Sequence, residues 1–147
     1  MSDITLGIIG SGQLGSLLCI AAKKLNIKTV VVSDDEKGPA QNFSDQFIFT
    51  KYDNDEKIKE FISKVDLVTY EFENIPVNIL KKIDKEKKVL PQPDINLIVQ
   101  NRKLEKTFIN NLNIKTTEWA FIKSANDINK SFFKFSILNC LVDIRFR

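Results

Sequence analysis

A glycine-rich turn near the start of the chain is the first place where the sequence could bind a ligand. Gly10, Gly12 and Gly15 lie in the run GSGQLG, between an apolar segment at 4–9 and a helical pattern at 14–25. The first N–H groups of a helix have no partner within it, so this junction favours an anion such as phosphate. The pattern predicts a phosphorylated small molecule as ligand. The plainer alternative is a tight turn in which glycine only allows close packing.

Two carboxylates form the second candidate group. Glu71 and Glu73 lie in TYEFENIP, at 69–76, where a predicted strand ends. Along a strand they would share one face, at the sheet edge where open α/β folds bind ligands. Ionised carboxylates accept hydrogen bonds from hydroxyl or amine groups. Together with the glycine turn they predict a sugar phosphate. In the simpler alternative, one glutamate caps the next helix and the other is solvated.

The rest of the sequence predicts the scaffold that positions these residues. Strands are expected at 4–9, 28–33, 46–49 and 66–70 with a short fifth at 89–90, and helices at 14–25, 54–63, after Pro76, and from Asp94 to Leu112. This alternation predicts an α/β fold, a doubly wound parallel sheet over residues 1–95. Residues 96–112 are expected to form a linker helix. In 113–147 the pattern predicts a strand at 116–122, a helix at 125–133 and an apolar tail.

Composition excludes several functional classes. The chain has no histidine, so serine triads and histidine metal sites cannot form within it. Its net charge of +3 is spread among acidic residues, which argues against nucleic acid binding. No apolar run approaches the roughly 20 residues of a membrane span, and no secretory signal is recognisable. We therefore expect a cytoplasmic protein without a membrane or nucleic acid partner.

A dinucleotide-binding domain is the main alternative on spacing alone. Asp34 and Asp35 end the second predicted strand about 20 residues after the glycine turn, where such domains bind a ribose hydroxyl. The segments at 71–74 and 100–106 have no evident role in hydride transfer, which disfavours an NAD(P)-binding domain. A non-catalytic nucleotide-binding fragment is a further alternative.

Four segments together resemble the N-terminal part of the 5-(carboxyamino)imidazole ribonucleotide synthases, ATP-grasp enzymes of purine biosynthesis. They are GSGQLG at 10–15, PAQ at 39–41, Asp66 with TYEFENIP at 69–76, and NRKLEK at 101–106. The resemblance is in register to about residue 112 and looser to about 138. It implies a Rossmann-like pre-ATP-grasp domain that binds substrate over 1–95, followed by the linker helix and, over 113–147, the incomplete start of an ATP-grasp domain.

The resemblance also implies an activity, an ATP-dependent carbon–nitrogen ligation. In this family ATP, accompanied by Mg²⁺, phosphorylates bicarbonate, and the carboxyphosphate transfers its carbon to the amine of 5-aminoimidazole ribonucleotide. Related enzymes are dimers, so a homodimer is expected by similarity. The implied substrate-binding residues are Gly12, Gln13, Leu14, Glu71 and Glu73, and Arg102 is implied to reach ATP. The alternative for Arg102 is a surface ion pair with Glu105 or Glu118. No catalytic residue and no metal ligand is implied within this chain.

The end of the chain departs from the family pattern. Asn139 stands where the ATP-binding lysine is expected, and residues 140–147 match nothing in the family. All five glycines lie at or before residue 38, so a glycine-rich lid cannot lie within residues 39–147. We therefore expect a truncated or frame-shifted product that binds the ribonucleotide weakly and does not turn over ATP. Its last segment, 134–147, is expected to be disordered or prone to aggregation.

Overall fold

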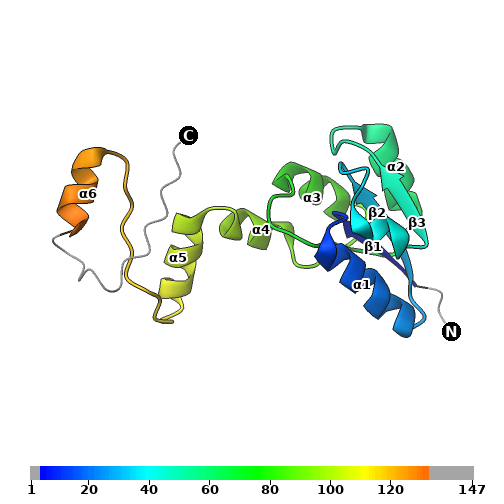
Figure 1. Cartoon of the computed structure of the whole chain (residues 1–147), viewed down its shortest axis with the longest axis horizontal. Helices are drawn as coiled ribbons and strands as arrows, with labels where there is room; N and C mark the ends of the chain where they lie inside the picture. Colours follow the sequence, from blue (N-terminus) through cyan, green and yellow to red (C-terminus); the bar gives the residue numbers. More distant parts are fainter. Residues whose placement is uncertain (1–3, 133–147) are drawn as a thin grey trace. The chain divides into compact units, whose positions relative to one another are not determined.

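The fold is built on a parallel sheet within residues 4–132, the part of the chain that the computed structural model describes. The strands are β1 (Thr5–Ile9), β2 (Lys28–Ser33), β3 (Gln46–Phe49) and β4 (Leu67–Tyr70), in the order β3-β2-β1-β4 (Figure 1). The fifth strand predicted at 89–90 is reduced to one parallel bridge between Val68 and Val89. The predicted α/β fold with a doubly wound parallel sheet is confirmed.

Helices cover both faces of this sheet. On one face, α1 (Gln13–Lys24) and the short 3-10 helix η1 (Pro39–Asn42) pack on Ile8 and Val31 through Cys19 and Ala40. The other face is covered by α2 (Asp55–Ser63) and α3 (Val77–Asp84). Its core contains Ile9, Val30, Val32 and Val68 from the strands and Ile58, Phe61, Ile79, Leu80 and Ile83 from the helices. Because successive strand residues face opposite sides, strands buried on both faces require continuous apolar runs such as that of β2.

The strand order reverses beside β1, and this reversal creates the place for a ligand. From β1 the chain proceeds to β2 and β3, and then crosses back to place β4 on the other side of β1. Ile9 is paired with both Val32 and Tyr70, so β1 and β4 end at the same level. In open parallel sheets, ligands bind where connections leave two adjacent strands in opposite directions. The glycine turn after β1 and the acidic segment after β4 meet at this point.

The chain divides into two compact units between Leu97 and Ile98. The helix predicted from Asp94 to Leu112 is wrong as a single element, because α4 (Pro93–Val99) ends before α5 (Arg102–Asn111) begins. Asn101 causes the break, since its side chain accepts hydrogen bonds from the N–H groups of Lys103 and Leu104 at 3.1 and 3.2 Å. Asparagine is a preferred helix N-cap, so it starts a new helix here.

The strand predicted at 116–122 is also wrong, because this segment is not a strand and pairs with none of the strands within residues 4–132. Its polar groups instead contact the Asn110 side chain, which bonds to Thr116 Oγ1 at 3.2 Å and to Trp119 Nε1 at 3.1 Å. The helix predicted at 125–133 is confirmed as α6 (Ala125–Phe132). The expectations for Asn139 and for the tail at 134–147 lie outside the described residues. Within residues 4–132, no helix is long and apolar enough to cross a membrane.

Candidate functional site

The side chain of Glu71 connects the end of β4 to the glycine turn. Its backbone N–H donates to Ile9 O at 3.1 Å, which extends the pairing of β4 with β1 by one residue. Its carboxylate then receives two hydrogen bonds from the turn, from Gly12 N to Oε1 at 2.7 Å and from Gly15 N to Oε2 at 2.5 Å. Hydrogen bonds to a charged group contribute about 1.5 to 3 kcal/mol each. Glu71 is therefore the anion at the N-terminus of α1.

The three glycines of the turn make room for this carboxylate. A Cβ atom on Gly10 would lie 2.6 Å from Glu71 Cγ, and Gly10 also has a φ of +102°, which disfavours other residues. A Cβ on Gly12 or Gly15 would lie 2.8 or 2.9 Å from a carboxylate oxygen. The glycine spacing that predicts a phosphate-binding turn thus makes room for the Glu71 carboxylate of the protein itself.

The expectation that these amides are open to a phosphate is therefore corrected. The N–H groups of Gly12 and Gly15 are occupied by Glu71, since each of its carboxylate oxygens accepts one of these two hydrogen bonds. The physical reasoning about the helix end was sound, since a helix N-terminus does favour an anion. The sequence identified both groups and did not show that one binds the other. Gln13 and Leu14 are exposed at the first turn of α1, Leu14 by 57%.

The segment that carries Glu73 is held at both ends. Because β4 ends at Tyr70, Glu71 and Glu73 do not share a strand face as predicted. Instead the segment turns, and the fully buried Asn96 donates from Nδ2 to Ile75 O at 3.0 Å. Glu73 is exposed between the Glu71 and Ile75 anchors. Glu73 is therefore exposed two residues after Glu71, whose own carboxylate contacts the glycine turn.

The segment after β2 is fastened to the other side of the turn. The buried Ser11 hydroxyl donates to Ser33 Oγ at 2.7 Å, and Ala40 N donates to Ser11 O at 2.9 Å. A Cβ on Gly38 would lie 1.8 Å from Ser11 Oγ, so only glycine fits there. Sequence reasoning missed Ser11 and Ser33. The pattern that could have revealed them is a serine near the ends of two adjacent strands.

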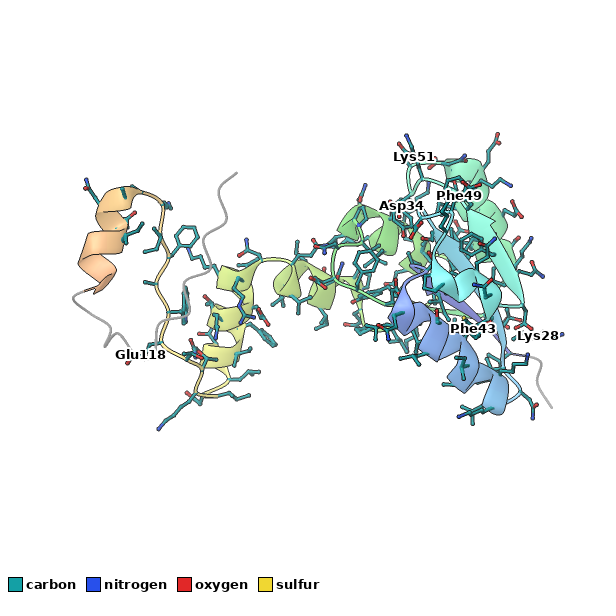
Figure 2. All side chains as sticks on the ribbon, viewed as in Figure 1. Lys28, Asp34, Phe43, Phe49, Lys51 and Glu118 are labelled. Atoms are coloured by element: carbon teal, nitrogen blue, oxygen red, sulfur yellow. The ribbon has the colours of Figure 1, made fainter. Side chains whose placement is uncertain are left out.

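Tyr52 is the other residue at this end of the sheet that sequence reasoning missed. It is 8% exposed, and its hydroxyl has no hydrogen-bond partner among residues 4–132. Burial raises the pKa of Tyr52 well above its ordinary value, and the charge of Asp34 adds to this effect. Figure 2 shows the side chains of Asp34 and Lys51, which follow β2 and β3, at the same end of the first unit. Lys28 and Phe43 mark its opposite end.

Arg102 belongs to the second unit and makes the ion pair with Glu105 that the sequence offers as the alternative to ATP binding. Its Nη1 lies 2.5 Å from Glu105 Oε2, and its side chain is 52% exposed. Such exposed pairs contribute about 0 to 1 kcal/mol, so this contact leaves the guanidinium available. Across the described part of the chain, no group of three or more cysteine, aspartate or glutamate side chains is placed to hold a metal ion.

Comparison with known proteins assigns the family. Residues 3–100 match the model of the ribonucleotide synthetase preATP-grasp domain, which is two thirds of the chain. The chain belongs to this family. The N5-carboxyaminoimidazole ribonucleotide synthase of Brucella melitensis is 36% identical to this preATP-grasp protein over 118 residues, which are 80% of the chain and 33% of that relative. The family resemblance seen in the sequence is thereby confirmed.

Solved structures of relatives share the fold of this preATP-grasp protein. The Staphylococcus aureus N5-carboxyaminoimidazole synthetase, complexed with ADP, superposes with a TM-score of 0.81 at 32% identity and covers 88% of this chain and 35% of its own. An Aspergillus clavatus synthase in complex with ADP and 5-aminoimidazole ribonucleotide gives a TM-score of 0.68 at 26% identity, over 80% of this chain and 32% of its own. The chain thus spans about a third of the length of these relatives.

Proposed function

We propose that this chain binds 5-aminoimidazole ribonucleotide as the N-terminal part of an ATP-dependent ligase that carboxylates it with bicarbonate in purine biosynthesis. The supporting observation is the glycine turn that Glu71 holds where the strand order reverses, with Glu73 exposed two residues further along the same segment. The proposal agrees with the ligand of the Aspergillus clavatus relative, which shares this fold. We expect the protein to act in the cytoplasm.

Each proposed contact uses a group that the site presents. Gln13 and Leu14 lie exposed at the first turn of α1, where backbone N–H groups can donate to the ribonucleotide. Gly12 shapes the approach of the ligand to the turn. The Glu73 carboxylate accepts hydrogen bonds from the ribose hydroxyls or the exocyclic amine, because an ionised carboxylate only accepts. Glu71 contributes through the turn rather than by contact.

The remaining substrates engage groups beyond this site. We propose that the Arg102 guanidinium contacts ATP, whose phosphates match its planar donor set. Mg²⁺ would accompany the ATP phosphates, but the described residues offer no cluster of ligands for it, so we assign it no ligand here. Bicarbonate would be activated by ATP as in the family, and a homodimer is proposed on the same resemblance. Light scattering of the purified chain tests that assembly.

The site geometry disfavours the NAD(P) alternative. A dinucleotide domain binds a pyrophosphate on the N–H groups of its glycine turn. In this chain Glu71 occupies two of those groups, at Gly12 and Gly15, and its negative charge would repel the pyrophosphate. Asp35, one of the two residues expected to bind the ribose hydroxyl of a dinucleotide, instead accepts a hydrogen bond at Oδ1 from Lys37 N of its own loop at 2.9 Å.

Isothermal titration of the full chain with 5-aminoimidazole ribonucleotide, ATP and NAD tests the proposal. We expect weak, saturable binding of the ribonucleotide, no binding of NAD, and no ATP turnover in the presence of bicarbonate. Glu73→Gln keeps the size of the side chain and is expected to weaken ribonucleotide binding about tenfold, because a charged acceptor is lost. Glu86→Gln removes the same charge from an exposed position in the turn after α3 and serves as the control. Binding of NAD without the ribonucleotide would overturn the proposal.

A further inference from the structure

We infer that Glu71 is a positioning residue, a built-in anion that sets the shape of the glycine turn and keeps phosphate off the Gly12 and Gly15 amides. The inference concerns a role of Glu71 within the protein. Only its consequence for the ribonucleotide rests on the proposed function. Two independent observations support it, namely the hydrogen bonds to both carboxylate oxygens and the fit of the three glycines around the side chain.

The geometry specifies a glutamate at this position. The backbone of Glu71 is fixed by the hydrogen bond from its N–H to Ile9 O at 3.1 Å, so the carboxylate must reach the turn through the length of its side chain. Aspartate is one methylene shorter and cannot reach both amides from this backbone. Glutamine keeps the length, but its amide nitrogen is a donor and would face the N–H of Gly12 or Gly15.

A carboxylate that neutralises a helix N-terminus changes what the turn can bind. Anions are favoured at such an end because the first N–H groups are unpaired and the helix dipole is positive there. The Glu71 carboxylate compensates the positive N-terminus of α1. A phosphate at this end would find the N–H groups of Gly12 and Gly15 already bonded and would be repelled by the negative charge of Glu71. The turn therefore orients the ribonucleotide without holding its phosphate at Gly12 and Gly15.

Chemical rescue of Glu71→Ala tests this inference without the ribonucleotide. The variant removes the internal anion and leaves the two amides open, so acetate or inorganic phosphate should bind and raise its thermal unfolding midpoint as the anion concentration rises. The measurement is made at constant ionic strength with chloride as the reference anion. The wild-type chain should show no such response, and neither should Glu86→Ala, which removes an exposed carboxylate from the turn after α3.

A folded Glu71→Ala variant whose midpoint does not respond to acetate or phosphate would overturn the inference, and so would an equal response of the wild type. If Glu71→Ala does not fold, Glu71→Gln provides the test. Its Gly12 and Gly15 amides should exchange hydrogen about tenfold faster than in the wild type, because charged hydrogen bonds are lost. Exchange as slow as in the wild type would also overturn the inference.

Ribonucleotide titration separates the two proposals. If the wild type binds and Glu71→Gln binds about tenfold more weakly while still folded, both proposals stand. Partial recovery of binding in Glu71→Ala on addition of acetate would identify a positioning role, because a direct ligand contact would not be restored in this way. If the wild type does not bind the ribonucleotide but anion rescue succeeds, the proposed function fails and the role of Glu71 stands. Equal binding by wild type and Glu71→Gln would overturn the role alone.

Discussion

The hydroxyl of Ser11 donates to the hydroxyl of Ser33 at 2.7 Å, and both side chains are buried. This contact joins the glycine turn after β1 to the end of β2. Glu71 joins the same turn to the end of β4 on the other side of β1. The turn is therefore held from both neighbouring strands before any ligand arrives, which reduces the ordering required on binding.

Ser33→Ala should lower the free energy of unfolding by about 1 to 2 kcal/mol, because the Ser11 hydroxyl keeps only its longer bond to Asp35 O at 3.3 Å and Asp35 N loses the Ser33 Oγ acceptor. Urea denaturation followed by circular dichroism measures the change. Ser63→Ala is the control, since the Ser63 hydroxyl bonds to Glu60 O at an exposed position. Equal losses in the two variants would show that the Ser11–Ser33 contact has no special importance.

Gly38→Ala should be more damaging, by about 2 to 3 kcal/mol, because it overpacks a buried contact. The new Cβ would lie 1.8 Å from Ser11 Oγ and 2.7 Å from Ser11 O. Because the second of these atoms belongs to the backbone, the double variant Gly38→Ala with Ser11→Ala should recover only part of the loss. Full recovery in the double variant would contradict the backbone clash.

Tyr52 should make the chain less stable at alkaline pH. Burial, followed by the charge of Asp34, raises the pKa of Tyr52 in the folded state above its ordinary value of about 10. Above about pH 10 the unfolded chain loses this proton first, so the free energy of unfolding falls as pH rises, by at most about 1.4 kcal/mol per pH unit. Below that pH the contribution is fully present.

Tyr52→Phe isolates this effect, because the variant retains every other group that titrates in the same range. The unfolding free energy of the wild type should fall relative to that of Tyr52→Phe between about pH 10 and pH 12. At neutral pH the substitution should be neutral or stabilising by up to about 1 kcal/mol, since the buried hydroxyl has no partner among residues 4–132. A constant difference across this pH range would contradict the burial of the hydroxyl.

Asn96→Ala should release the segment that carries Glu73. The substitution removes the hydrogen bond from Asn96 Nδ2 to Ile75 O and should lower the unfolding free energy by about 1 to 2 kcal/mol. It should also weaken ribonucleotide binding while Glu73 itself is unchanged. Asn78→Ala, at an exposed position in α3, controls for the gain in helix propensity. A loss of stability without any loss of affinity would show that Asn96 does not position Glu73.

The scaffold was predictable because its signals are local. The apolar run of β2 and the glycine turn before α1 each specify their element from a few neighbouring residues, and their alternation predicts the parallel sheet. The missed break at Asn101 has a local cause as well, since a capping side chain within an apolar helical pattern starts a new helix. At 116–122 the residue types favour a strand, but none of the strands within residues 4–132 pairs with this segment, and propensity alone does not report pairing.

The position of the candidate site was predictable from the sequence, but the hydrogen bonds between its residues were not. Both the glycine turn and Glu71 were identified, because the carboxyl ends of parallel strands are the expected ligand edge. The contact between Glu71 and Gly15 joins residues far apart in the sequence, so no local pattern reports it. The serine pair and Tyr52 escaped notice for the same reason, since their importance comes from burial in the folded chain.

The amide spectrum of the isotopically labelled full chain, titrated with 5-aminoimidazole ribonucleotide, tests the central claim most directly. We predict saturable shifts of the amide signals of Gly12, Gln13, Leu14 and Glu73, and no such shifts on addition of NAD. Saturable shifts that leave the glycine turn and Glu73 unchanged, or an equal response to NAD, would contradict the proposal that these residues form a ribonucleotide site.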